Sequence, residues 1–116
     1  MEQRRTKRFD LELPLAITRA GAERVSMLGL TKNISSTGVL FTSGSPADLG
    51  GPIEYVIKLN AVASQPVSLR CVGKVLRSEP FYANGGNRLS FTIAVTLERY
   101  EFVREPQPLL NVAGLR

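Results

Sequence analysis

The sequence predicts an all-β domain, in the form of a small six-stranded antiparallel β-barrel. Four long segments alternate apolar and polar residues with a period of two, and clusters of turn-forming residues recur about every dozen residues. No segment of comparable length has the 3.6-residue period of an amphipathic helix. A barrel is favoured over an open sandwich because closure removes exposed sheet edges. The length of 116 residues fits one domain.

Four segments are the clearest strands, because their alternation is typical of antiparallel strands with one buried face. These segments are 9–17, 53–60, 67–75 and 89–98. In the first, Phe9, Leu11, Leu13, Leu15 and Ile17 share one face. Pro14 lies within the same segment. Since proline cannot donate to a ladder, we expect this strand to be an edge strand or an irregular one.

Two shorter strands complete the predicted barrel, one from about Arg24 to Ile34 and one over residues 39–42. The phase of the alternation slips between Met27 and Leu28, which predicts a bulge or a bend near Gly29. Turn-forming residues separate the strands at 20–22, 43–46, 49–52 and 84–87.

The C-terminal part of the chain has the weakest pattern. Residues 97–104 fit a short helix or a continuation of the last strand, and we favour an extended strand end followed by an irregular tail. Pro106 and Pro108 would stop a regular helix soon afterwards. The expected organisation is a flexible arginine-rich arm over 1–8, a barrel over 9–105 and a tail over 106–116.

The basic charge of the chain is concentrated at its N-terminus. The formal net charge is +5, and residues 1–8 hold four basic side chains against one acidic side chain. The other 108 residues hold 11 basic and 9 acidic side chains. This placement favours a local anion site over a broad nucleic-acid-binding face, and we expect no nucleic-acid partner.

Several classes of function are disfavoured by what the composition lacks. The sequence has no histidine and one cysteine, Cys71, which we interpret as a buried apolar residue. The commonest general base and metal ligand are therefore missing, and no nucleophile elbow or phosphate-binding Gly-Lys loop is present. We expect no enzyme activity, no metal and no cofactor. No segment approaches the roughly 20 apolar residues of a membrane-spanning helix, so we expect a cytoplasmic protein without membrane insertion.

Two short motifs point to a specific ligand. The segment 4–8 contains an Arg-x-x-x-Arg spacing, and the segment 33–38 contains Asn-x-Ser-x-x-Gly. Together and in this order they resemble the signature of the PilZ domain family, and the resemblance covers nearly the whole chain. It implies a small six-stranded barrel that serves in bacterial signalling as a receptor domain for the second messenger cyclic di-GMP.

The residue types in the two motifs suit this ligand. An arginine guanidinium can form paired hydrogen bonds with a phosphate or with the O6/N7 edge of guanine. The resemblance assigns Arg4 and Arg8 to this role, and Arg5 between them could add a phosphate contact. Arg77 matches neither motif, and we interpret it as an exposed residue at the end of a strand.

In the second motif, the Asn33 amide can pair with a guanine edge and the Ser35 hydroxyl can donate or accept. Gly38 permits a positive φ or the close approach of a ligand. The predicted cyclic di-GMP site is therefore Arg4, Arg5, Arg8, Asn33, Ser35 and Gly38.

The favoured hypothesis is a stand-alone sensor or adaptor in which ligand binding changes the conformation of the arm for a downstream effector protein. Two alternatives stay open. One is a PilZ-type adaptor that acts without nucleotide. The other is a small nucleic-acid-binding barrel, which would need exposed aromatic platforms and a basic groove.

Overall fold

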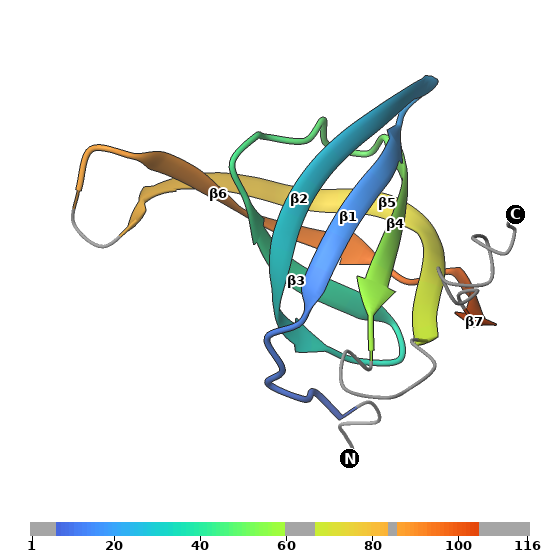
Figure 1. The fold of residues 1–116 in the computed structure, drawn as a ribbon. Helices are drawn as coiled ribbons and strands as arrows, with labels where there is room; N and C mark the ends of the chain where they lie inside the picture. Colours follow the sequence, from blue (N-terminus) through green and yellow to red (C-terminus); the bar gives the residue numbers. More distant parts are fainter. Residues whose placement is uncertain (1–6, 60–66, 84–85, 105–116) are drawn as a thin grey trace, which may run out of the picture.

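The computed structural model describes residues 7–59, 67–83 and 86–104. They form one antiparallel sheet of seven strands, which Figure 1 shows closed into a barrel. The strands are β1 (Pro14–Ala20), β2 (Glu23–Ile34), β3 (Gly38–Ser43), β4 (Pro52–Lys58), β5 (Val67–Tyr82), β6 (Leu89–Thr96) and β7 (Arg99–Arg104).

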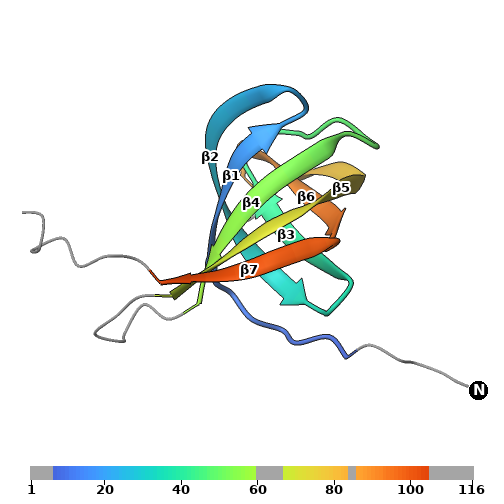
Figure 2. The same cartoon turned by 90° about the vertical axis from the view of Figure 1, so that its right-hand side faces the viewer.

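The barrel closes through the long strand β5. The strand order is β4-β1-β2-β3-β6-β5-β7, and an additional pairing between β4 and β5 joins the ends of the six-stranded part. β5 can do this because its 16 residues use different partners along their length. One edge of its first half pairs with β4 and the other with β7, whereas its second half pairs with β6. The predicted six-stranded antiparallel barrel is confirmed, with β7 as one extra strand on the outside (Figure 2).

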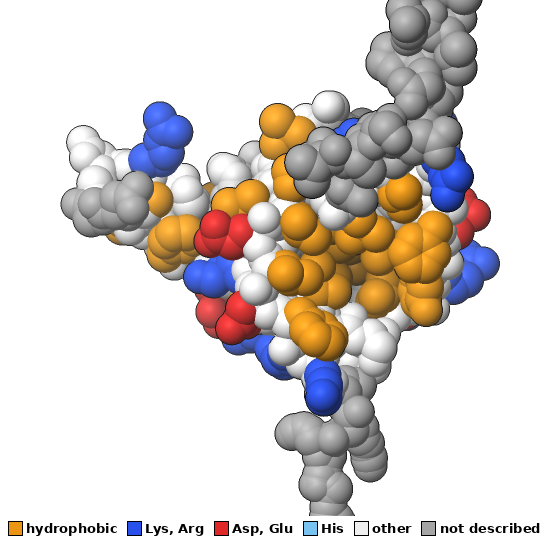
Figure 3. Space-filling model, turned by 60° about the horizontal axis from the view of Figure 1, so that its bottom comes forward, with side chains coloured by type: hydrophobic (Ala, Val, Ile, Leu, Met, Phe, Trp, Pro, Cys, Tyr) orange, Lys and Arg blue, Asp and Glu red, His pale blue; other side chains and the backbone are white. Residues whose placement is uncertain are grey.

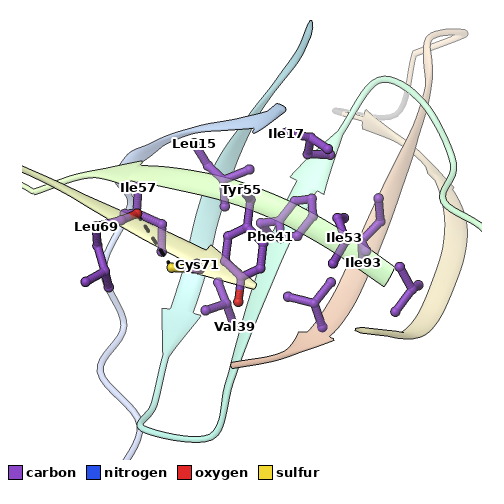
Figure 4. Packing of buried hydrophobic residues seen from close by; sticks show 12 residues of the cluster. Leu15, Ile17, Val39, Phe41, Ile53, Tyr55, Ile57, Leu69, Cys71 and Ile93 are labelled. Atoms are coloured by element: carbon purple, nitrogen blue, oxygen red, sulfur yellow. Dashed lines mark hydrogen bonds between the residues drawn. The ribbon is translucent and has the colours of Figure 1, made fainter. Parts of the chain in front are cut away.

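The core is made by the inward-facing half of each alternating strand. Phe41 and Tyr55 lie at its centre, with ring centroids 6.3 Å apart. Apolar side chains from β1, β4, β5 and β6 surround them (Figure 4). The Tyr55 hydroxyl donates a hydrogen bond to the Thr96 carbonyl at 3.0 Å, so its polar atom is satisfied.

The first strand differs from its prediction in length and position. β1 begins at Pro14 and lies between β2 and β4, so it is not an edge strand. Proline is tolerated there because it is the first residue of the strand. The pairing of β1 with both neighbours shifts between Ile17 and Arg19, so the alternative prediction of an irregular strand is confirmed. The preceding segment makes one isolated bridge, Phe9 to Ile34, and Phe9 and Leu11 are exposed.

The irregularities of β2 lie on either side of Gly29 and not at Gly29 itself. Gly29 pairs in normal register with Leu15 and Ser43, whereas the pairing with β1 shifts between Met27 and Arg24 and the pairing with β3 shifts between Thr31 and Asn33. The apparent slip of phase arose because Leu28 occupies a solvent-facing position, where its side chain is 77% exposed.

The preference for an extended C-terminal end is confirmed by β7. Tyr100 and Phe102 pair with Cys71 and Leu69, so they lie on the sheet face that is interior in β5, yet both are exposed. Figure 3 shows hydrophobic side chains gathered over the lower end of the barrel. No helix of the described residues is long and apolar enough to cross a membrane.

Candidate functional site

A row of four side-by-side residues crosses the outer face of the barrel. Asn33 of β2 pairs with Leu40 of β3, Leu40 pairs with Ala94 of β6, and Ala94 pairs with Arg77 of β5. Directly paired residues of antiparallel strands project to the same side. The row therefore has a low apolar floor, Leu40 and Ala94, between two polar ends.

Two bulges turn these polar ends outward. Thr31 and Val75 point into the core and are 0% and 4% exposed, so strict alternation would also turn Asn33 and Arg77 inward. The pairing shifts between Thr31 and Asn33 in β2, and between Val75 and Arg77 in β5. Each bulge adds one residue to its strand and reverses the phase that follows, as bulges near functional sites commonly do.

The turn between β2 and β3 is built around Ser35. Its Oγ accepts hydrogen bonds from the backbone N–H of Thr37 at 3.2 Å and of Gly38 at 3.1 Å. Its own backbone N–H donates to the Gly38 carbonyl at 2.9 Å. The hydroxyl therefore fixes the shape of the turn, as serine side chains do in turns of this kind.

Gly38 allows two strands to approach closely at the end of this turn. A Cβ placed on Gly38 would lie 2.9 Å from the Val95 carbonyl oxygen of β6. The glycines with positive φ among the described residues are Gly21 and Gly50, so Gly38 is needed for space and not for an unusual φ.

Arg8 is held beside the row by the segment that precedes β1. Its Nη1 donates to Asn33 Oδ1 at 3.4 Å. The next residue, Phe9, exchanges two backbone hydrogen bonds with Ile34, at 2.8 and 2.9 Å. The backbone thus places Arg8 at the polar end of the row that Asn33 forms.

These residues line one cavity of about 170 Å³. Its lining comprises Arg8, Asn33, Ser35, Thr37, Gly38, Val39, Leu40, Leu76, Arg77, Ala94 and Val95. The lining includes two arginines, an amide and two hydroxyls, and no carboxylate. This set of donors suits an anionic ligand. The volume is below the roughly 300–1,000 Å³ of typical enclosed ligand pockets, so a nucleotide-sized ligand would lie over this surface.

The structure brings together four of the six predicted site residues, namely Arg8, Asn33, Ser35 and Gly38. Arg4 and Arg5 lie outside the described residues. Arg77 is not at the end of a strand as interpreted, because β5 continues to Tyr82, and it lines the same cavity. No sequence pattern marks Arg77, because its outward position depends on the bulge in β5, beside which Leu76 is also exposed.

Chemistry of other kinds has little support among the described residues. They contain no group of three or more Cys, Asp or Glu side chains that could hold a metal ion. Cys71 lies in the core, and burial raises the pKa of its thiol to about 12. It is therefore protonated at neutral pH and is a poor nucleophile.

A small closed β-barrel with a cationic site on its outer face belongs to the class of binding domains. The family model for the PilZ domain matches residues 2–102, which is most of the chain. The chain therefore belongs to the PilZ family, a family of receptor domains for cyclic di-GMP. Among the curated proteins, none matches this sequence.

Proposed function

We propose that this protein binds cyclic di-GMP over the row Asn33–Leu40–Ala94–Arg77 and acts as a sensor for a downstream effector protein. The observation that carries the proposal is the placement of Arg8 against Asn33 at one end of the row, with Arg77 at the other end. A ligand with two phosphates and two guanines can use both cationic ends at once.

Each part of the row has a distinct role in the proposal. The guanidinium of Arg8, with Arg4 and Arg5 of the same arm, contacts phosphate and the guanine edge. Asn33 pairs with a guanine edge, since its amide offers both donors and an acceptor. Leu40 and Ala94 form the floor on which a purine face can rest, because their side chains are small or apolar. Ser35 and Gly38 keep the turn in the shape that presents Asn33.

The signal follows from the position of the arm. The segment up to Phe9 is attached to β2 through the bridge to Ile34. A bound nucleotide adds phosphates between the arginines of the arm and Arg77, and so favours an arm that lies over the row. An effector that contacts the arm or the row then meets a different surface in each state.

The proposal is tested by calorimetric titration of the full chain with cyclic di-GMP. We expect micromolar or tighter binding, weakened about 10- to 100-fold by Arg8→Ala and by Arg77→Ala, because each variant removes a charge-assisted hydrogen bond.

Arg70→Ala is the matched control. This exposed β5 arginine pairs with Glu101 at 3.1 Å and lies outside the row, so its loss should leave the affinity unchanged. An absence of heat up to about 100 µM nucleotide would leave the adaptor that acts without nucleotide as the better hypothesis. Equal affinities for the Arg77→Ala and Arg70→Ala variants would exclude Arg77 from the site.

A further inference from the structure

A second feature of the barrel surface is a group of apolar residues around one groove, which we call the outer apolar patch: the exposed Leu28, Leu30 and Leu89 and the half-buried Phe81. Leu28 is 77% exposed, Leu89 43% and Leu30 41%. The four residues line one groove of about 590 Å³, which lies between β2 and the β5–β6 hairpin. Clustered exposed apolar residues of this kind mark interaction sites, unlike single exposed leucines.

The patch follows from the regular phase of β2. The inward positions of β2 hold Val25, Met27 and Thr31, which face the barrel interior. Leu28 and Leu30 occupy the alternate, outward positions, where their side chains do not contribute to the packing of the core. Their exposure therefore calls for an explanation outside the folding of this chain.

The β5–β6 hairpin supplies the opposite wall of the groove. It extends away from the barrel body (Figure 1). Beyond Phe91, β6 has no partner in β3, so Phe81, Tyr82, Leu89 and Ser90 belong to a two-stranded ribbon. Such ribbons are marginally stable alone in water, and this one leaves Tyr82 63% exposed. An occupant of the groove would therefore stabilise the hairpin as well as cover the leucines.

The charges around the patch indicate the chemistry of the occupant. Arg88 lines the groove, exposed Lys32 lies two residues from Leu30 in β2, and Arg77 lies in the nucleotide row on the far side of Glu79. Glu79 is the one carboxylate in the outer rows that connect the patch with the nucleotide row. A second copy of the chain would bring the same cations together across a two-fold axis, which is unfavourable. An acidic partner would meet them with the opposite charge.

We propose that the outer apolar patch is the docking surface for an amphipathic acidic segment of a partner protein, with leucine-like side chains in the groove and carboxylates near Arg88 and Lys32. This inference goes beyond nucleotide binding and does not depend on it. The patch residues lie on β2, β5 and β6, three of the four strands that carry the nucleotide row. Leu30 pairs with Thr42, which lies two residues along β3 from Leu40 of the nucleotide row. A partner on the patch is therefore next to the nucleotide site.

The experiment uses two synthetic fluorescent peptides of about 16 residues, with leucines at i, i+3, i+4 and i+7. The polar positions are glutamate in one peptide and lysine in the other. Fluorescence anisotropy is measured with the full chain in the absence of nucleotide, so that failure of the proposed function does not affect the result. We expect binding of the glutamate peptide below about 100 µM and at least tenfold weaker binding of the lysine peptide.

Three variants test the location. Leu28→Thr/Leu30→Thr introduces β-branched polar residues that suit a strand, and it should weaken binding of the glutamate peptide at least about tenfold. Leu49→Thr is the matched control, since Leu49 is 69% exposed but lies outside the groove. Arg88→Glu should reverse the preference toward the lysine peptide. Thermal unfolding followed by circular dichroism checks that each variant is folded.

The proposal is overturned by any of three results. One is the absence of glutamate-peptide binding at about 100 µM. The second is an equal loss of affinity in the Leu49→Thr control. The third is a dimer in sedimentation velocity that the Leu28→Thr/Leu30→Thr variant abolishes, because the second copy would then be the occupant.

Discussion

At the scale of single residues, Gly73 sets how closely two parts of the barrel approach. A Cβ on Gly73 would lie 1.9 Å from the Thr96 carbonyl oxygen and 2.7 Å from its carbon. Around this contact, the Lys74 N–H donates to Thr96 Oγ1 at 2.8 Å and the Glu98 N–H donates to the Val72 carbonyl at 2.9 Å. The chain between β6 and β7 thus rests on the backbone of β5, and a side chain at position 73 would separate them.

We therefore expect Gly73→Ala to lower the free energy of unfolding by about 3 kcal/mol or more, since the atom it meets belongs to the backbone and cannot rotate away. Urea unfolding followed by tyrosine fluorescence measures the change. Gly44→Ala is the control, because a Cβ there meets nothing within 4 Å. Similar losses in the two variants would show that the β6–β7 connection can move away from β5.

At the scale of elements, Thr31 connects β2 to the segment that carries Arg8. This fully buried residue donates through Oγ1 to the Leu11 carbonyl and accepts from the Leu13 N–H at 2.8 Å. The Thr31 N–H also donates to the Leu13 carbonyl at 3.0 Å. The segment before Pro14 is not part of a strand, and the Thr31 side chain attaches it to β2 through these hydrogen bonds.

Replacement by the nearly isosteric valine tests this role. Thr31→Val leaves the Leu13 N–H and the Leu11 carbonyl without this partner, so we expect a loss of about 1–3 kcal/mol in unfolding free energy. Cyclic di-GMP affinity should also fall, because Arg8 is positioned through this segment. Thr42→Val, whose hydroxyl makes an exposed 3.5 Å contact to the Leu30 carbonyl, should change neither quantity. A stable Thr31→Val protein with normal affinity would contradict the role of Thr31 as an anchor.

The elements also show what the sequence can predict and where such prediction stops. Alternation identifies Leu15, Ile17, Ile57 and Ile93 as core residues because burial of one face imposes a period of two. The bulges that turn Asn33 and Arg77 outward have no such signature, since they depend on how each strand pairs with its neighbour. Motif spacing therefore found Asn33, but not Arg77.

At the scale of the whole molecule, the strand order separates the core of the barrel from the proposed binding surface. The closing pair β4–β5 and strand β1 contribute core residues such as Leu15 and Tyr55. The nucleotide row crosses the outer faces of β2, β3, β6 and β5, and the outer apolar patch has residues in β2, β5 and β6. Substitutions on the outer rows should therefore alter ligand binding with small effects on the free energy of unfolding. Substitutions of core residues in β1, β4 and β5 should lower the free energy of unfolding with small direct effects on binding.

The core also makes the stability of the whole barrel sensitive to alkaline pH. Burial raises the pKa of the Cys71 thiol from 9.0 to about 12, and burial, followed by the neighbouring Cys71, raises the pKa of the Tyr55 hydroxyl above its usual value of 10.0. The unfolded chain releases these protons near their ordinary values, while the folded chain retains them. Above about pH 9 the folded state therefore binds more protons than the unfolded state, and the free energy of unfolding falls as pH rises.

Urea unfolding between pH 7 and pH 10 measures this effect before most lysines titrate, near pH 10.4. We expect a constant midpoint up to about pH 8.5 and a progressive decrease above it. In Cys71→Ala the stability at pH 7 is lower, because a small cavity forms, but the decrease should begin about one pH unit later, where Tyr55 becomes the first core group to ionise in the unfolded chain. Identical pH profiles for the two proteins would show that the Cys71 thiol does not set the alkaline limit of the fold.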